Sequence, residues 1–200
     1  MGTNLLAPNG LQLLRNKISG ANTYQANQYF IKQGYATNIG KGDPVKTGTG
    51  ANQGYIVLAT PADTEILGIF QGVLAYYDST LQGTSHGLNG AWPGSNANAN
   101  ADIPCMVYSD AFVTFMAQVN GLVFVQSWRG QNINFVASAP NSAGVSTIAL
   151  DSTSINTTAT LPFKIEGPAG VSGGPQDPGN TNPWIEVRLN TAEMLAATGI

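Results

Sequence analysis

Hydrophobic and polar residues along this chain follow the two-residue period of β-strands over most of its length. The cleanest example is residues 184–189 (WIEVRL), which place three aliphatic side chains on one face and Trp, Glu and Arg on the other. Residues 112–118 are apolar at positions of both faces, which is typical of a strand covered on both sides. These two patterns indicate strands in a packed core.

Residues 65–78 form the longest uncharged segment of this kind, with an acid at each end and none between. Gly68 and Gly72 interrupt it, and each would cost about 1 kcal/mol relative to Ala inside a helix. A bent or bulged strand accepts glycine more readily. The segment therefore predicts a central strand of an all-β fold.

Shorter apolar runs between Gly, Asn and Pro turn signals predict the remaining strands. The Asn120-Gly121 pair predicts a tight hairpin, because both central positions of a type I′ turn need a positive φ. Residues 79–101, 138–160 and 167–183 are predicted to be long loops. The predicted strands cover residues 24–31, 34–39, 54–59, 103–108, 111–118, 122–129, 133–137, 145–150 and 161–166. Together they predict an antiparallel β-barrel or β-sandwich with long loops.

Residues 1–22 differ from the rest and are predicted to be an N-terminal arm, with residues 23–200 forming a single β domain. Leucines and an isoleucine recur between residues 11 and 18 and predict one or two helical turns, ended by Gly20. This segment packs either on its own domain or on a neighbouring subunit. A short helix is also expected at residues 191–197.

Charged residues make up 10% of the chain, against about 25% in an average soluble protein. With 42% hydrophobic residues the chain can still form a core. The low charge favours either a β protein with long turns or one whose surface is partly covered by partners, and the second interpretation predicts an oligomer. The eight Lys and Arg are scattered along the chain, and the net charge is −3. A nucleic-acid partner is not expected without a basic stripe.

The chain also lacks the patterns of membrane insertion and export. Its apolar runs are shorter than the ~20 residues that span a bilayer, and no signal-peptide pattern opens the sequence. We therefore expect no membrane partner. The single cysteine, Cys105, lies in an apolar run and is predicted to be a buried thiol.

One motif resembles a catalytic site, but its context does not. Gly83-Thr84-Ser85-His86-Gly87 matches the G-x-S-x-G elbow of esterases, which needs a strand before it and a helix after it. The residues that follow cannot begin a helix cleanly, and His86, the only histidine, is beside the serine inside the motif. A second match at residues 170–174 has a proline close behind it and no histidine downstream. The sequence therefore does not predict an enzyme.

Metal binding has equally little support. One His and one Cys cannot supply the three or four N and S ligands that zinc needs. Asp177, Asn180 and Asn182 offer oxygen ligands suited to Ca²⁺, but their spacing matches no EF-hand and such residues are common in turns. No metal or cofactor is expected.

Several motifs in one order resemble the capsid decoration, or cement, proteins of tailed bacteriophages. They are GDPV at 42–45, ILGIFQG at 66–72 with tyrosines at 76 and 77, WPG at 92–94, VYSD at 107–110 before FVTF at 112–115, and WIEVRLN at 184–190. The resemblance covers about residues 24–190. It implies a β-barrel or β-sandwich core, usually a homotrimer, that binds the outer face of the shell made by the major capsid protein. It also implies a location on the virion exterior and offers no catalytic residue.

Residues expected to contact capsid or sister subunits come from the arm and the two loops of highest Gly, Asn and aromatic content. They are Leu5, Leu6, Leu11, Leu14, Trp92, Asn180 and Asn182. The alternative hypothesis is a carbohydrate- or receptor-binding module of a phage tail or adhesin. In that case Trp92, Tyr76 and Tyr77 would stack on sugars.

Overall fold

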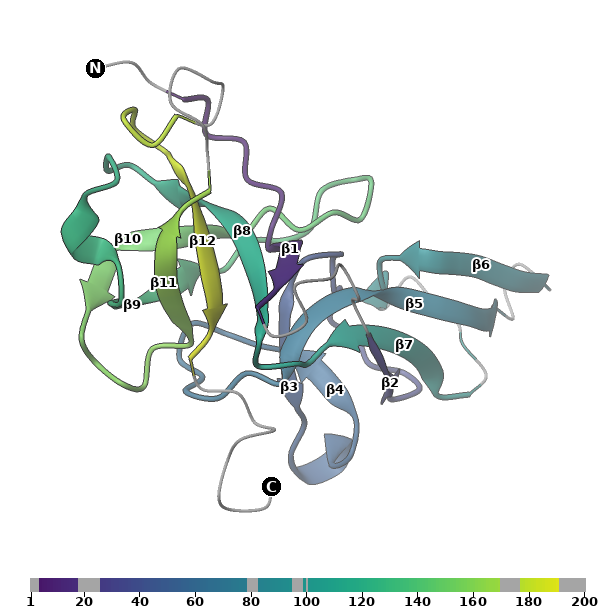
Figure 1. Ribbon diagram of the computed structural model, residues 1–200. Helices are drawn as coiled ribbons and strands as arrows, with labels where there is room; N and C mark the ends of the chain where they lie inside the picture. The colour runs from purple at the N-terminus through teal and green to yellow at the C-terminus, as the bar shows by residue number, and fades with distance from the viewer. Residues whose placement is uncertain are drawn as a thin grey trace.

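A computed structural model describes residues 4–17, 26–78, 83–94, 99, 101–169 and 177–190, with the backbone alone for 77–78 and 83–89. The regular elements that can be bounded within these residues are strands and the short 3₁₀ turns η1 (Gly50–Asn52) and η3 (Gln126–Trp128). The structure confirms the predicted all-β fold. Strands form two sheets, a closed barrel and an open sheet that extends from one side of it (Figure 1).

The barrel closes because its strands form a hydrogen-bonded ring in the order β8-β10-β9-β11-β12 and back to β8. Neighbours are antiparallel except β10 and β8, which are parallel. A sixth strand, β1 (Gln12–Asn16), pairs with the first half of β8. The ring strands are β8 (Val113–Asn120), β9 (Asn132–Val136), β10 (Ala149–Asn156), β11 (Phe163–Pro168) and β12 (Trp184–Leu189).

The barrel core follows from the alternation in these strands. In β12, Ile185, Val187 and Leu189 are buried in the main hydrophobic cluster, as the predicted alternation requires. Phe115 of β8 and Phe163 of β11 belong to the same cluster and are 0% exposed. Residues of the opposite face, Glu186 and Arg188 among them, are directed to the outside of the barrel and form the polar contacts described below.

The open sheet has the order β2-β7-β5-β3-β4, and β6 pairs with β5 beyond this path. Its strands surround a second hydrophobic cluster that includes Phe70, Val107 and Trp92. The long β5 and its partner β6 project farthest from the barrel (Figure 1). The strands are β2 (Asn27–Ile31), β3 (Pro44–Thr47), β4 (Ile56–Leu58), β5 (Gly68–Asp78), β6 (Gly83–Gly90) and β7 (Ile103–Tyr108).

Strand β5 connects the two cores. Ile69 belongs to the barrel cluster, and its neighbour Phe70 belongs to the second cluster, since successive strand residues point to opposite faces. Two different constraints explain why this strand has glycine at positions 68 and 72. A Cβ at Gly68 would collide with the carbonyl oxygen of Tyr108, and Gly72, with a φ of 150°, follows a register shift against β7.

The N-terminal arm differs from its prediction. The leucines of residues 11–14 lie on or beside strand β1, and no helical turn forms over the described part of the segment. A period of three or four in so short a segment does not specify a helix, and pairing with β8 supplies the hydrogen bonds that an isolated turn would lack. Residues 18–20 and the helix predicted at 191–197 lie outside the described residues.

Other predictions of strands, turns and loops were also wrong. Residues 34–39 form a turn, in which Ile39 bridges to Trp92. No hairpin forms at Asn120-Gly121, because the chain continues into η3 and β8 pairs instead with β10. The predicted loop 79–101 contains β6, and the edge strand predicted at 145–150 is displaced to β10. Residues 122–129, predicted as a strand, form a loop and η3.

Candidate functional site

The described part of the arm is fixed to one end of the barrel by neutral amides. Asn4, 5% exposed, donates from Nδ2 to the carbonyl oxygen of Asp177 at 3.0 Å. Asn182, 9% exposed, donates from Nδ2 to the Asn4 carbonyl at 2.9 Å, and its Oδ1 accepts the Gly121 N–H at 2.7 Å. Asn180 donates to Asn4 Oδ1 at 3.4 Å. The two predicted asparagines therefore lie together, and they hold the arm.

Gln118 of β8 completes this attachment from the barrel wall. Its Nε2 donates to the Leu5 carbonyl at 2.7 Å, and its Oε1 accepts the Ala7 N–H at 2.9 Å. These bonds order the backbone while the Leu5 and Leu6 side chains stay 81% and 51% exposed. Buried amide side chains thus fix the backbone of two adjacent leucines whose own side chains are exposed to solvent.

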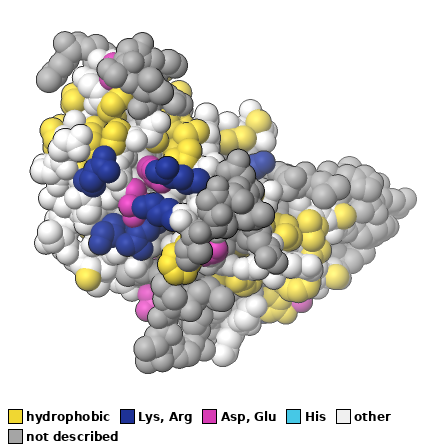
Figure 2. All heavy atoms as spheres, in the orientation of Figure 1, with side chains coloured by type: hydrophobic (Ala, Val, Ile, Leu, Met, Phe, Trp, Pro, Cys, Tyr) yellow, Lys and Arg dark blue, Asp and Glu magenta, His cyan; other side chains and the backbone are white. Residues whose placement is uncertain are grey.

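Two further exposed hydrophobics, Leu122 and Val125, lie in the loop after β8 at the same end of the barrel. This loop runs beside the segment that holds the arm, since Phe124 N–H bonds to the Pro178 carbonyl at 3.2 Å. We call Leu5, Leu6, Leu122 and Val125 the arm-end surface. Hydrophobic side chains gather at this end of the barrel in Figure 2.

Other predicted contact residues occupy different places. Leu11 is 3% exposed in the barrel core, and Leu14 is half-buried on β1. Trp92 is 1% exposed, donates its indole N–H to the Tyr35 carbonyl at 2.9 Å and meets the Tyr76 ring edge-on at 5.6 Å. As a core residue, Trp92 has no free face for a sugar or a protein partner. The Tyr77 side chain lies outside the described atoms.

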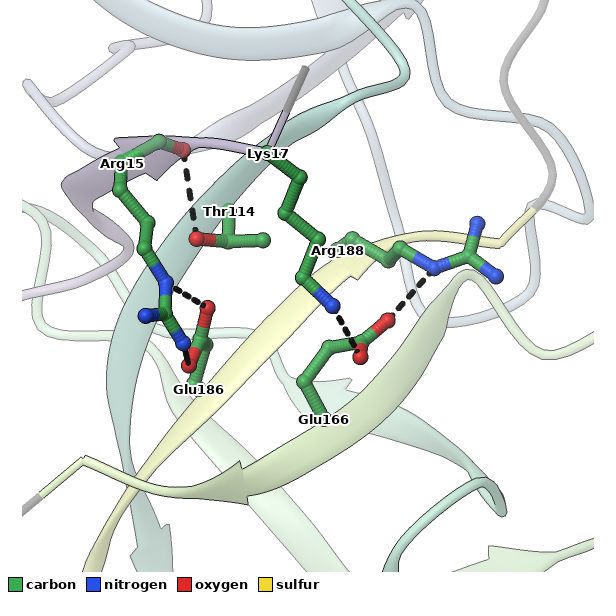
Figure 3. A network of polar contacts seen from close by, with 6 residues as sticks. All are labelled: Arg15, Lys17, Thr114, Glu166, Glu186 and Arg188. Carbon is green, nitrogen blue, oxygen red and sulfur yellow. Dashed lines mark hydrogen bonds and ion pairs between the residues drawn. The ribbon is translucent and has the colours of Figure 1, made fainter. Parts of the chain in front are cut away.

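A second group of side chains lies on the outer face of β1, β11 and β12 (Figure 3). Arg15 forms a two-bond contact with Glu186, in which Nε donates to Oε1 at 2.8 Å and Nη2 donates to Oε2. The Glu186 side chain is 6% exposed, so its charge needs this partner. The hydrogen bond to Glu186, followed by the attraction of its charge, raises the pKa of Arg15.

Glu166 of β11 accepts from two cations in the same view (Figure 3). Arg188 Nε donates to its Oε1 at 2.7 Å, and Lys17 Nζ donates to its Oε2. Burial acts to raise the pKa of Glu166, but the hydrogen bonds from Lys17 and Arg188 outweigh burial and lower it. Glu166 is therefore an anion that holds two cations on the barrel surface.

The same face also carries Lys164, which is directly opposite Arg188 in the ladder, and Arg129, whose guanidinium lies against Gly167. Lysines and arginines visibly gather on this side of the barrel (Figure 2). The cations are scattered along the sequence, but the fold brings five of the eight together here. We call Arg15, Lys17, Arg129, Lys164 and Arg188 the cationic face.

The motif with catalytic resemblance lies in an unsuitable element. Gly83–Gly87 is part of strand β6, whereas a nucleophile elbow is a turn between a strand and a helix. Cys105 is buried as predicted, and burial raises the pKa of its thiol to about 12, which keeps it protonated and unreactive. Within the described ranges, no three His, Cys, Asp or Glu side chains lie close enough to hold a metal ion.

No helix in the described part of the chain is long and apolar enough to cross a membrane. No protein-family model matches the sequence, and neither a curated protein nor a solved structure gives a match. The class that the fold defines is an all-β protein, a five-stranded barrel with an attached open sheet.

Proposed function

We propose that this protein is a structural component of a tailed-phage virion, a homotrimeric decoration protein that binds the outside of the capsid and stabilises its subunit junctions. A protein that binds only the assembled shell favours assembly by mass action. The order of sequence motifs and the all-β fold support this proposal. A carbohydrate-binding function has less support, because Trp92 is in the core.

The observation that carries the proposal is the arm-end surface. Ordering Leu5 and Leu6 costs conformational entropy, and in the isolated chain their exposed side chains gain little hydrophobic stabilisation in return. Burial of a leucine side chain against a partner contributes about 1.5–3 kcal/mol. A pair of exposed leucines on a fixed backbone therefore suits a protein that docks on another protein.

The test uses shells of the phage that carries the gene, assembled without this protein. We expect the Leu5→Ser/Leu6→Ser variant to lose at least tenfold in affinity for shells, measured by co-sedimentation, because about 3 kcal/mol of apolar burial is removed. Phe30→Ser/Val136→Ser, which changes two exposed hydrophobics outside the arm-end surface, is the matched control. A truncation is less suitable, since it would remove β1 and buried Leu11.

Failure of the wild-type protein to co-sediment with shells would contradict the proposal as a whole. Equal binding by the leucine variant and the wild type would contradict the role of the arm-end surface. Cryo-electron microscopy of decorated shells would then show whether the added density is trimeric and on the exterior.

A further inference from the structure

The strand register arranges cations in a row across the barrel. Lys164 of β11 is opposite Arg188 of β12, Arg188 is opposite Thr114 of β8, and Thr114 is opposite Arg15 of β1. Three of the four positions in this row are cationic. Like charges on directly paired positions are destabilising, so the Lys164–Arg188 pair costs stability that an anionic partner would recover.

The two carboxylates of the face do not balance this charge. Five cations surround Glu166 and Glu186, which leaves three surplus positive charges on this face of a protein whose net charge is −3. Among the described side chains, neither Arg129 nor Lys164 has an ion-pair partner. Arg129 also lies over Gly167, where a Cβ would come within 2.8 Å of its guanidinium.

The composition of the face distinguishes between anionic partners. Its two glutamates would repel the closely spaced phosphates of a nucleic acid. Three of its five cations are arginines, whose guanidinium groups pair with carboxylates in a planar fork. Half-buried Met116 is opposite Glu186 in the next row, and both Arg and Met are enriched at protein–protein interfaces.

We infer that the cationic face is a second docking surface, separate from the arm-end surface, for a protein partner whose surface is rich in carboxylates. The identification of that partner as the capsid subunit rests on the proposed function, whereas the chemistry of the face does not. Glu166 and Glu186 hold three of the cations in place before binding, which reduces the freedom lost on association. Arg129 and Lys164 supply the charge that the partner neutralises.

The key variant is Arg129→Gln/Lys164→Gln, because it removes the two cations of this face that form no ion pair with a described side chain and leaves the network of Figure 3 intact. The control, Lys32→Gln/Lys41→Gln, removes the same charge from outside the face. Binding is measured to poly-L-glutamate, heparin and duplex DNA of matched charge, and to shells assembled without this protein. We expect the key variant to bind both poly-L-glutamate and shells at least about fivefold more weakly than the control, with the difference falling as salt rises.

Each alternative result has a distinct meaning. Shell binding by the key variant equal to that of the control would overturn the inference and leave the proposed function standing. Tighter binding to DNA or heparin than to poly-L-glutamate, lost in the key variant, would overturn the choice of a carboxylate partner. If the wild-type protein does not bind shells, the proposed function is wrong. The inference is then supported or overturned by whether the key variant binds poly-L-glutamate more weakly than the control.

Discussion

The barrel and the open sheet are built from similar strands but differ in their edges. Barrel strands close into a ring, so their backbone groups find partners within the ring, whereas the open sheet ends at β4, at β2 and beside β6. Five of the eight cations lie on the barrel, and the other three, Lys32, Lys41 and Lys46, lie in or beside strands of the open sheet. The barrel can carry many charges on its outer face because the hydrophobic core inside the ring of strands stabilises it.

The open sheet, in contrast, depends on its junction with the barrel. Ile66 and Ile69 belong to the barrel cluster. Phe70, which follows Ile69 in β5, belongs to the second cluster. Backbone bonds also cross the junction, since Leu11 N–H bonds to the Gly42 carbonyl at 3.0 Å and Ser146 N–H, between β9 and β10, bonds to the Lys41 carbonyl at 2.9 Å. The two regions should therefore unfold together.

Truncation of one large side chain in each core tests this cooperativity. We expect Phe115→Ala in the barrel and Trp92→Ala in the open sheet each to lower the free energy of unfolding by about 3–5 kcal/mol. Both variants should shift a single transition, followed by circular dichroism and by tryptophan fluorescence in urea. A Trp92→Ala protein that melts in two steps, with the barrel step unchanged, would show instead that the two regions are independent.

The buried carboxylate at the junction should make this shared stability depend on pH. Burial raises the pKa of Asp43 to about 6, although the nearby Ser146 side chain and the hydrogen bond from the Gly40 N–H oppose the rise. An unfolded aspartate titrates near 3.9, so unfolding releases a proton between about pH 4 and 6. The contribution of Asp43 therefore becomes less favourable as pH rises through this window, by about 3 kcal/mol in total.

Asp43→Asn removes this titration and retains an oxygen to accept the Gly40 N–H, now 2.6 Å from Asp43 Oδ2. We expect the variant to gain stability relative to wild type between pH 4 and 7, measured by urea denaturation at each pH. Glu65→Gln, which neutralises an exposed carboxylate, serves as the control. A constant difference between Asp43→Asn and wild type over this range would refute the assignment.

Within the barrel, the paired and unpaired cations should differ in their effect on stability. Arg15→Gln leaves the Glu186 carboxylate, 6% exposed, without its cation, and we expect a loss of about 1–2 kcal/mol because Arg15 itself is largely in water. Arg129→Gln removes no ion pair and should change stability by less than about 0.5 kcal/mol. Equal losses in thermal denaturation would mean that the network of Figure 3 contributes no more than a solvated charge.

Strands whose pattern and burial agree could be predicted from the sequence, and β12 and β7 are the best cases. Their hydrophobic patterns are local, so the sequence contains them: β7 alternates between buried and half-buried residues, and β12 buries Ile185, Val187 and Leu189 as its alternation predicts. Strand β1 could not be predicted in this way, because its state depends on pairing with β8, about a hundred residues later. The Asn120-Gly121 signal failed for the same reason, since Gly121 takes a φ of 89° to direct its N–H to Asn182 rather than to close a hairpin.

The candidate surfaces were predictable only in part. Leu5, Leu6, Asn180 and Asn182 were named from composition, and the structure brings them to one end of the barrel, but their role as contacts stays a prediction. The cationic face was missed because its members are separated by up to 173 positions in sequence. One signal was present, since Lys164 and Arg188 both occupy the polar face of strands with clear alternation.

The smallest loss expected from a broken contact concerns the first residues of the arm, which Asn182 and Gln118 fix to the barrel. Asn182 has a φ of 55°, a left-handed conformation that asparagine tolerates better than most residues. Asn182→Gly keeps this backbone and removes the bonds to Asn4 and Gly121, and we expect it to cost about 1 kcal/mol. Hydrogen exchange should quicken at the Asn4 and Gly121 amides and stay unchanged in β5 and β7. Faster exchange in β5 would mean that the arm end and the open sheet are coupled through the barrel, which would remove the distinction between a self-sufficient barrel and a dependent sheet.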